Sequence, residues 1–232
     1  MPGSRPDLIR RGRLAVISPH FDDAVFSCGD LLAKYPGTVV ITAFGARPRA
    51  GAGITPWDAA AGFSKGDDVV GARREEDRQA LQVLSAVPVW LDFRDGQYGP
   101  SPSPSALARG LDKAVRQADP TAICVPLGLF HSDHRLTHAA SLAVVDRHPQ
   151  LAAFCYEDAI YRRFPGLVRE RLAALRRGGR VLRRAGFAPR ATGPLKRRAV
   201  ACYRSQLRAL SNPGRPGFAD VFATEGYWRL VR

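Results

Sequence analysis

Short apolar segments alternate with longer segments of helical periodicity along the front part of this chain. Buried strands are predicted at residues 13–18, 38–44, 87–91, 121–126 and 151–156, and helices at 23–35, 69–84, 103–118 and 134–145. Strand and helix in repetition favour a parallel sheet, because each right-handed crossover returns the chain to the same edge of the sheet with a helix on one face. We therefore predict an α/β sandwich built around a mostly parallel sheet.

The rest of the chain is less regular. Residues 45–68, rich in Gly, Pro and Ala, are predicted to form a long loop, which in a compact domain is usually functional or mobile. The other predicted elements are a basic, partly helical segment at 161–190, a helix at 194–210, a turn-rich loop at 212–217 and a terminal strand at 225–231. No repeat or linker divides the chain, so we expect one domain over residues 1–232.

The compartment is inferred from two features. The basic N-terminal segment lacks the apolar core of a signal peptide, and no apolar run approaches the ~20 residues that span a bilayer. The cysteines, Cys28, Cys124, Cys155 and Cys202, lie far apart, which is typical of free thiols. A cytoplasmic enzyme is therefore expected.

The formal net charge is +14, and nearly all of the excess is arginine. Such an excess fits a nucleic-acid or membrane-surface binding module, an anionic substrate, or simply a solvated basic surface. The basic stretch 162–190 supports the binding module, but its only aromatic side chains are Phe164 and Phe187. Nucleic-acid binding usually shows more stacking residues, so we expect no nucleic-acid partner.

Two polar clusters follow predicted strands. Pro19-His20-Phe21-Asp22-Asp23 comes directly after the first strand, where His20 and Asp23 can converge on one point and Asp22 can face the same pocket. Neutral imidazole and carboxylate are good ligands for a borderline divalent ion such as zinc. The competing interpretation is that Asp22 or Asp23 merely caps the following helix.

The second cluster, His131-Ser132-Asp133-His134, follows the fourth strand. Ligands bind at the carboxyl ends of parallel strands, near a topological switch point, and both clusters are expected at that edge. The sequence therefore predicts a metal site there. A rival ligand pair is His134 with His138, four positions apart on one helix, but Arg135 stands where such helices supply a Glu.

At these motifs the chain resembles the PIG-L/LmbE-like N-deacetylases, a family with P-H-P-D-D-E after its first strand and H-x-D-H after its fourth. This chain has PHFDDA and HSDH, and the resemblance extends to Arg73 with Glu76, Asp95-Gly96, residues 203–206 and Glu225. It implies a Rossmann-like three-layer sandwich without a dinucleotide, in line with the absence of GxGxxG after the first strand.

The resemblance also implies residue roles. The ligands of a zinc ion, or of another divalent metal, would be His20, Asp23 and His134. Asp22 would be the general base and His131 the electrophile, and Asp133 would orient His131. Phe21 replaces the family's Pro and Ala24 its Glu. Neither is a ligand, so we expect activity to survive and any effect to fall on metal affinity.

Hydrolysis by activated water suits these roles. Three protein ligands leave one position of the metal open to water, whose pKa falls from ~15.7 towards ~7. Asp22 would take the proton and return it to the leaving amine. Protonated His131, kept charged and oriented by Asp133, would stabilise the oxyanion.

The substrate implied by the resemblance is an N-acyl, usually N-acetyl, amino sugar attached to a larger group; an amide conjugate without a sugar is the alternative. Trp57 and Phe63 are candidates for a stacking wall, and Asp95, Gln97 and Tyr98 for contacts with hydroxyl groups. Arg73 is a further candidate through the resemblance. The candidates for contact with an anionic group are Arg47, Arg49, Arg94 and Arg135.

Overall fold

The computed structural model describes residues 13–186 and 193–231. Its centre is a seven-stranded sheet with the order β3-β2-β1-β4-β5-β7-β6. The strands are β1 (Leu14–Ser18), β2 (Val39–Thr42), β3 (Val87–Trp90), β4 (Ala122–Pro126), β5 (Ala152–Tyr156), β6 (Val181–Ala185) and β7 (Tyr227–Val231). Strands β1 to β5 are parallel, while β7 runs antiparallel to both β5 and β6. The predicted α/β architecture with a mostly parallel sheet is confirmed.

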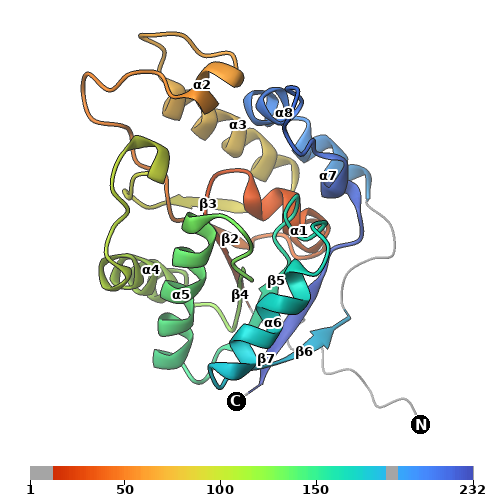
Figure 1. The fold of residues 1–232 in the computed structure, drawn as a ribbon. Helices are drawn as coiled ribbons and strands as arrows, with labels where there is room; N and C mark the ends of the chain where they lie inside the picture. Colours follow the sequence, from red (N-terminus) through yellow and green to blue (C-terminus); the bar gives the residue numbers. More distant parts are fainter. Residues whose placement is uncertain (1–12, 187–192, 232) are drawn as a thin grey trace.

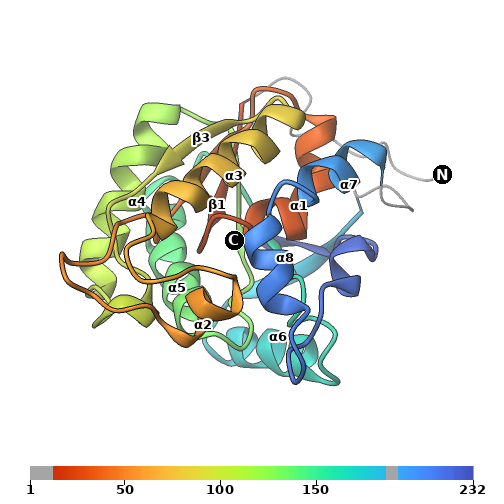
Figure 2. The ribbon, with the colours of Figure 1, turned by 90° about the horizontal axis from the view of Figure 1, so that it is seen from above.

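Helices cover both faces of the sheet (Figures 1 and 2). They are α1 (Asp23–Lys34), α2 (Pro56–Ala60), α3 (Val69–Val83), α4 (Pro104–Ala118), α5 (Ser132–Arg147), α6 (Leu167–Arg177), α7 (Pro194–Val200) and α8 (Arg204–Leu210), with short 3-10 turns η1 (Gly96–Tyr98) and η2 (Ala219–Phe222). Buried side chains of α1, α3 and α7 form the core on one face, and those of α4, α5 and α6 the core on the other. No helix in the described part of the chain is both long and apolar enough to cross a membrane.

Strand β1 lies between β2 and β4, and this placement creates the switch point of the sheet. It pairs in parallel with β2 on one side and with β4 on the other, with Leu14 opposite Ala122. Every residue of β1 and of β4 is buried. The two polar clusters therefore follow neighbouring strands at the same edge, as the sequence predicts.

Three segments differ from the sequence-based expectation. The loop over 45–68 contains α2. Thr55 caps this helix, because its hydroxyl accepts from the Asp58 N–H. The helix expected over 194–210 is two helices, α7 and α8. The basic stretch 162–190 holds α6 and then β6, whose arginines are the charges typical of an edge strand. Residues 187–190, like the N-terminal residues 1–12, lie outside the described residues.

Several arginines of that basic stretch are paired within the protein. Arg162 binds Asp220, Arg180 binds Asp146 and Arg184 binds Glu157. Their charges are therefore partly matched inside the fold.

A buried ion pair joins the C-terminal part of the chain to α1. Lys196 and Glu225 are buried and their charged atoms lie 2.8 Å apart. Glu225 also accepts from the N–H groups of Asp30 and Leu31 in α1. These two residues follow Cys28, whose backbone dihedrals are not helical. The carboxylate thus satisfies donors beside the irregularity in the helix.

Asp77 on α3 makes the stability of the protein depend on pH. Burial raises its pKa to about 7, although it accepts from Trp90 Nε1 and from the Tyr203 hydroxyl. The folded protein therefore holds a proton that the unfolded chain releases above pH ~4, and stability falls as the pH rises from about 4 to about 7. At about 1.4 kcal/mol per pKa unit, the loss is at most about 4 kcal/mol.

An Asp77→Asn protein should lack this dependence. The amide can accept from Trp90 and donate to Tyr203, whose hydroxyl then donates to the carbonyl oxygen of Phe21, 3.1 Å away. Thermal unfolding at pH 5 and pH 8 should show a larger fall for the natural protein than for the variant. Parallel profiles would contradict the assignment.

Candidate functional site

The turn after β1 is built by hydrogen bonds of its own residues. Ser18 Oγ donates to the carbonyl oxygen of His20 and accepts from the Ala24 N–H, and the His20 N–H donates to Asp23. Asp22 is the N-terminal cap position of α1, yet its side chain makes no capping bond. The capping interpretation therefore does not account for either carboxylate, since that of Asp23 is bound to His20.

Two side chains of this turn, His20 and Asp23, converge on one point with His134 of α5. The Asp23 carboxylate oxygen lies 3.1 Å from His20 Nδ1 and 3.3 Å from His134 Nε2. One ligand atom of each residue lies within 4.8 Å of the other two. Tetrahedral coordination with bonds of about 2.0–2.2 Å places ligand atoms about 3.3–3.6 Å apart. The donor set and its spacing therefore fit a divalent cation.

Asp158 is a residue of this site that the sequence analysis missed. It follows β5, is 1% exposed, and accepts at 2.6 Å from His134 Nδ1. Its other oxygen accepts from the N–H groups of Gly128 and Leu129, which fixes the carboxylate. With its proton on Nδ1, His134 presents a lone pair on Nε2 to the site. The strand-end rule applied to β5 would have singled out Asp158.

Asp133 stands behind His20 in the same way. Its carboxylate lies 3.2 Å from His20 Nε2 and accepts from the Gly96 N–H at 3.0 Å. A side chain at Gly96 would crowd this carboxylate, because a Cβ there would lie 3.2 Å from Asp133 Oδ1. Gly96 thus permits the close approach of η1 to the start of α5.

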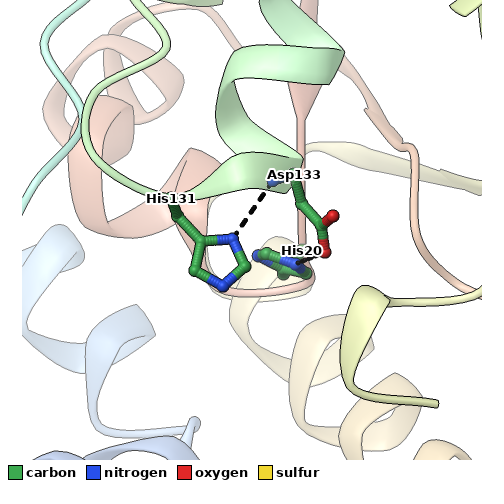
Figure 3. Close-up of side chains that lie close together, drawn as sticks. All are labelled: His20, His131 and Asp133. Carbon is green, nitrogen blue, oxygen red and sulfur yellow. Dashed lines mark hydrogen bonds and ion pairs between the residues drawn. The ribbon is translucent and has the colours of Figure 1, made fainter. Parts of the chain in front are cut away.

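His131 is positioned by the backbone of Asp133. Its Nδ1 accepts from the Asp133 N–H at 3.2 Å, so the neutral ring carries its proton on Nε2 (Figure 3). Burial lowers the pKa of His131. The predicted role of the Asp133 side chain in charging and orienting His131 stays a prediction, since the hydrogen bonds described for that carboxylate are with His20 and the Gly96 N–H.

His20, His131 and Asp133 form a second group whose ligand atoms lie within 4.8 Å of one another. The Asp133 carboxylate in it is fully buried and bound to Gly96. In the first group, each imidazole has one nitrogen supported by a carboxylate and the other directed at Asp23. The first group is therefore the better cation site.

The electrostatics of the first group favour positive charge. Burial opposes protonation of His134, yet Asp23 and Asp158 raise its pKa to about 9. Burial also opposes protonation of His20, but neighbouring carboxylates, of which Asp95 has the largest effect, raise the pKa of His20 well above its usual value. Burial would raise the pKa of Asp23, but His134 foremost holds it well below its usual range. A divalent cation would replace the protons that these carboxylates attract.

Asp22 lies beside the ligand group as a separate acid. Burial, and then the neighbouring Asp23, raise its pKa to about 7. It lines the same cavity as His20 and His131. A carboxyl group with such a pKa can take up and return a proton near neutral pH.

His138 is placed away from this group. Its Nδ1 donates to the carbonyl oxygen of Pro126 at 2.8 Å and the side chain is 2% exposed. Its ring is tied to β4, and it does not line the cavity that contains His134.

The two departures from the family motif are accommodated by packing. Phe21 is buried, its carbonyl accepts from Tyr203, and its ring meets Trp90 edge to face at 6.3 Å. Ala24 is fully buried in the apolar core, where an acid would need a partner.

A cavity of about 680 Å³ opens over the site. Five of the ten candidate substrate residues line it, namely Trp57, Arg73, Asp95, Gln97 and Tyr98. Phe63 does not contribute to the lining, and neither do the four arginines expected to contact an anionic group, which are all exposed: Arg47, Arg49, Arg94 and Arg135.

Arg73 and Tyr98, which line the cavity, are already bound to the buried Asp58. Arg73 pairs with Asp58 at 2.9 Å and donates to the Tyr98 hydroxyl, which itself donates to Asp58. Trp57 donates to Gln206, and Arg215 lies over its ring at 5.2 Å. The Arg73 charge is thus matched inside the protein.

The chain is similar to known proteins both in sequence and in fold. A family model described as GlcNAc-PI de-N-acetylase (PIG-L) matches residues 15–145. The chain is 30% identical over 170 residues to a 2'-N-acetylparomamine deacetylase of Streptomyces fradiae, an alignment covering 66% of this chain but 59% of that protein.

Solved structures show the same fold. A triple mutant of a deacetylase from the teicoplanin biosynthetic pathway is similar with a TM-score of 0.76 and 25% identity, covering 95% of this chain and 98% of that one. The zinc-inhibited form of teicoplanin deacetylase is similar with a TM-score of 0.73 and 23% identity, covering 95% and 98%.

Proposed function

Because this chain belongs to the GlcNAc-PI de-N-acetylase (PIG-L) family, we propose that it is a metal-dependent hydrolase that removes an N-acetyl group from an amino sugar carried on a larger molecule. The relative from Streptomyces fradiae is named for such a reaction on an amino-sugar compound. The observation that carries the proposal is the convergence of His20, Asp23 and His134 beside Asp22.

His20, Asp23 and His134 would hold the metal. When bound, a divalent cation supplies Lewis acidity, which lowers the pKa of a water at the site and polarises an amide carbonyl. Zinc suits these ligands, as do other divalent ions. The teicoplanin deacetylase is named as zinc-inhibited, so the supporting ion has to be identified by experiment.

The remaining steps fall to residues of the chain. Asp22 takes a proton from the attacking water, and the same group then donates it to the nitrogen of the leaving amine as the C–N bond breaks. His131, with its proton on Nε2, donates to the carbonyl oxygen as negative charge develops there. Asp133 and Asp158 hold the imidazoles of His20 and His134 in place.

Substrate contacts are proposed for the polar groups at the cavity wall. Asp95, which accepts from the backbone and side chain of Gln97, is placed to bind sugar hydroxyls, and Trp57 to pack against a ring. Arg73 and Tyr98 support this wall through Asp58.

Removal of the metal should abolish activity. After chelator treatment, release of amine from N-acetylated sugars and their conjugates should cease, and addition of zinc, cobalt or manganese should restore it. The unfolding temperature should also fall, because a ligand at a hundredfold excess over its Kd stabilises a protein by about 3 kcal/mol. Full turnover by protein shown to be metal-free by elemental analysis would contradict the proposal.

A further inference from the structure

Three aromatic rings form one wall of the cavity, beginning at the metal centre. The Tyr161 ring meets His134 edge to face at 5.2 Å and stacks on Phe130 at 5.3 Å with 23° between the planes. Phe130 in turn contacts Phe164 at 5.5 Å. All three line the cavity, and together we call Phe130, Tyr161 and Phe164 the aromatic platform.

Phe130 is exposed although its backbone holds an unfavourable conformation. It is 65% exposed, the highest fraction among the exposed large apolar side chains of residues 13–186 and 193–231. Its φ is +58°, a left-handed conformation unfavourable for a bulky residue. An exposed ring held in this way beside His131 points to a binding role.

The cavity is larger than an acetylated sugar needs. An N-acetylhexosamine has roughly 15 non-hydrogen atoms, and even if each atom filled as much space as a water molecule in the liquid, about 30 Å³, the sugar would require about 450 Å³. The cavity holds about 680 Å³. Its size therefore leaves room for part of a further group.

We infer that the aromatic platform binds a flat apolar group of the aglycone attached to the amino sugar. An acetyl group supplies only one methyl, and Trp57 is already proposed to pack against the sugar ring, which leaves the platform for another part of the substrate. Stacking on exposed rings suits a planar apolar partner. This inference rests on the proposed deacetylation for the identity of the sugar, but the platform can be tested without it.

The test compares phenyl with methyl glycosides. Phenyl and methyl β-glucoside have no amide, so their dissociation constants report binding alone; phenyl and methyl N-acetyl-β-glucosaminide give kcat/KM from amine release. The variants are Phe130→Gly, which removes the ring and relieves the positive φ, and Phe164→Ala. Val181→Ala, an exposed apolar position on β6, is the matched control.

The natural protein and the Val181→Ala control should prefer the phenyl compound about two- to tenfold, and both platform variants should lose that preference. Equal affinity of the natural protein for both glucosides, or a preference retained in both variants, would overturn the platform. A preference in binding without any amine release would support the platform and refute the deacetylation. Amine release without a phenyl preference would support the deacetylation and refute the platform.

Discussion

An Asp22→Asn protein will bind metal like the natural protein and turn over roughly 100- to 10,000-fold more slowly. The amide has the shape of the acid but cannot accept the proton of the attacking water. Asp22 makes no capping bond to α1, so the helix does not lose a cap. Burial beside Asp23 disfavours the charged form of Asp22, so removing that charge should not lower stability near pH 8.

The measurement is kcat from amine release together with metal content by elemental analysis. Asp67→Asn is the control and should retain full turnover, because Asp67 is an exposed loop residue whose side chain, among the bonds described, accepts only from the nearby Ser64 N–H. Unchanged turnover in Asp22→Asn would remove Asp22 from the base role. Loss of the metal would make it a ligand instead.

An Asp158→Asn protein is expected to bind its metal about 10- to 100-fold more weakly. The asparagine oxygen would take the N–H donors of Gly128 and Leu129, which places its NH₂ group against His134 Nδ1. His134 would then accept at Nδ1 and carry its proton on Nε2. The atom that faces Asp23 would lose the lone pair that a metal needs.

Metal dissociation constants from competition with a chelator test this directly. The control is Asp112→Asn, because Asp112 is also a buried carboxylate bound to an imidazole, that of His148 at 2.7 Å, but on α4 and outside the cavity. It should leave metal affinity unchanged. An unaltered metal affinity in Asp158→Asn, or an equal loss in both variants, would show that Asp158 does not act through His134.

The fold was predictable where local pattern and chain topology agree. Buried strands β1 and β4 are read from unbroken apolar runs, and their parallel pairing follows from the helices between them. The break between α7 and α8 and the edge strand β6 were not predicted. Their sequences are rich in arginine and alanine, which have no strong periodicity, and packing against neighbouring elements decides their form.

The site was predictable to the same extent. His20 and Asp23 are close in sequence, and the strand-end rule brings His134 to them. Asp158 was missed although it follows β5, and Gly96 was named only through the family resemblance. Their roles depend on contacts with His134 and Asp133 that are made only in the folded protein.

By itself, the sequence determined the parallel sheet and the two polar segments at its carboxyl edge, because apolar periodicity and strand order are local properties that propagate through chain connectivity. Only the tertiary structure decided which carboxylate supports which imidazole, how Phe130 is displayed, and that Arg73 is already paired with Asp58. Those outcomes depend on distances of a few ångströms between segments far apart in the chain, which burial and packing set.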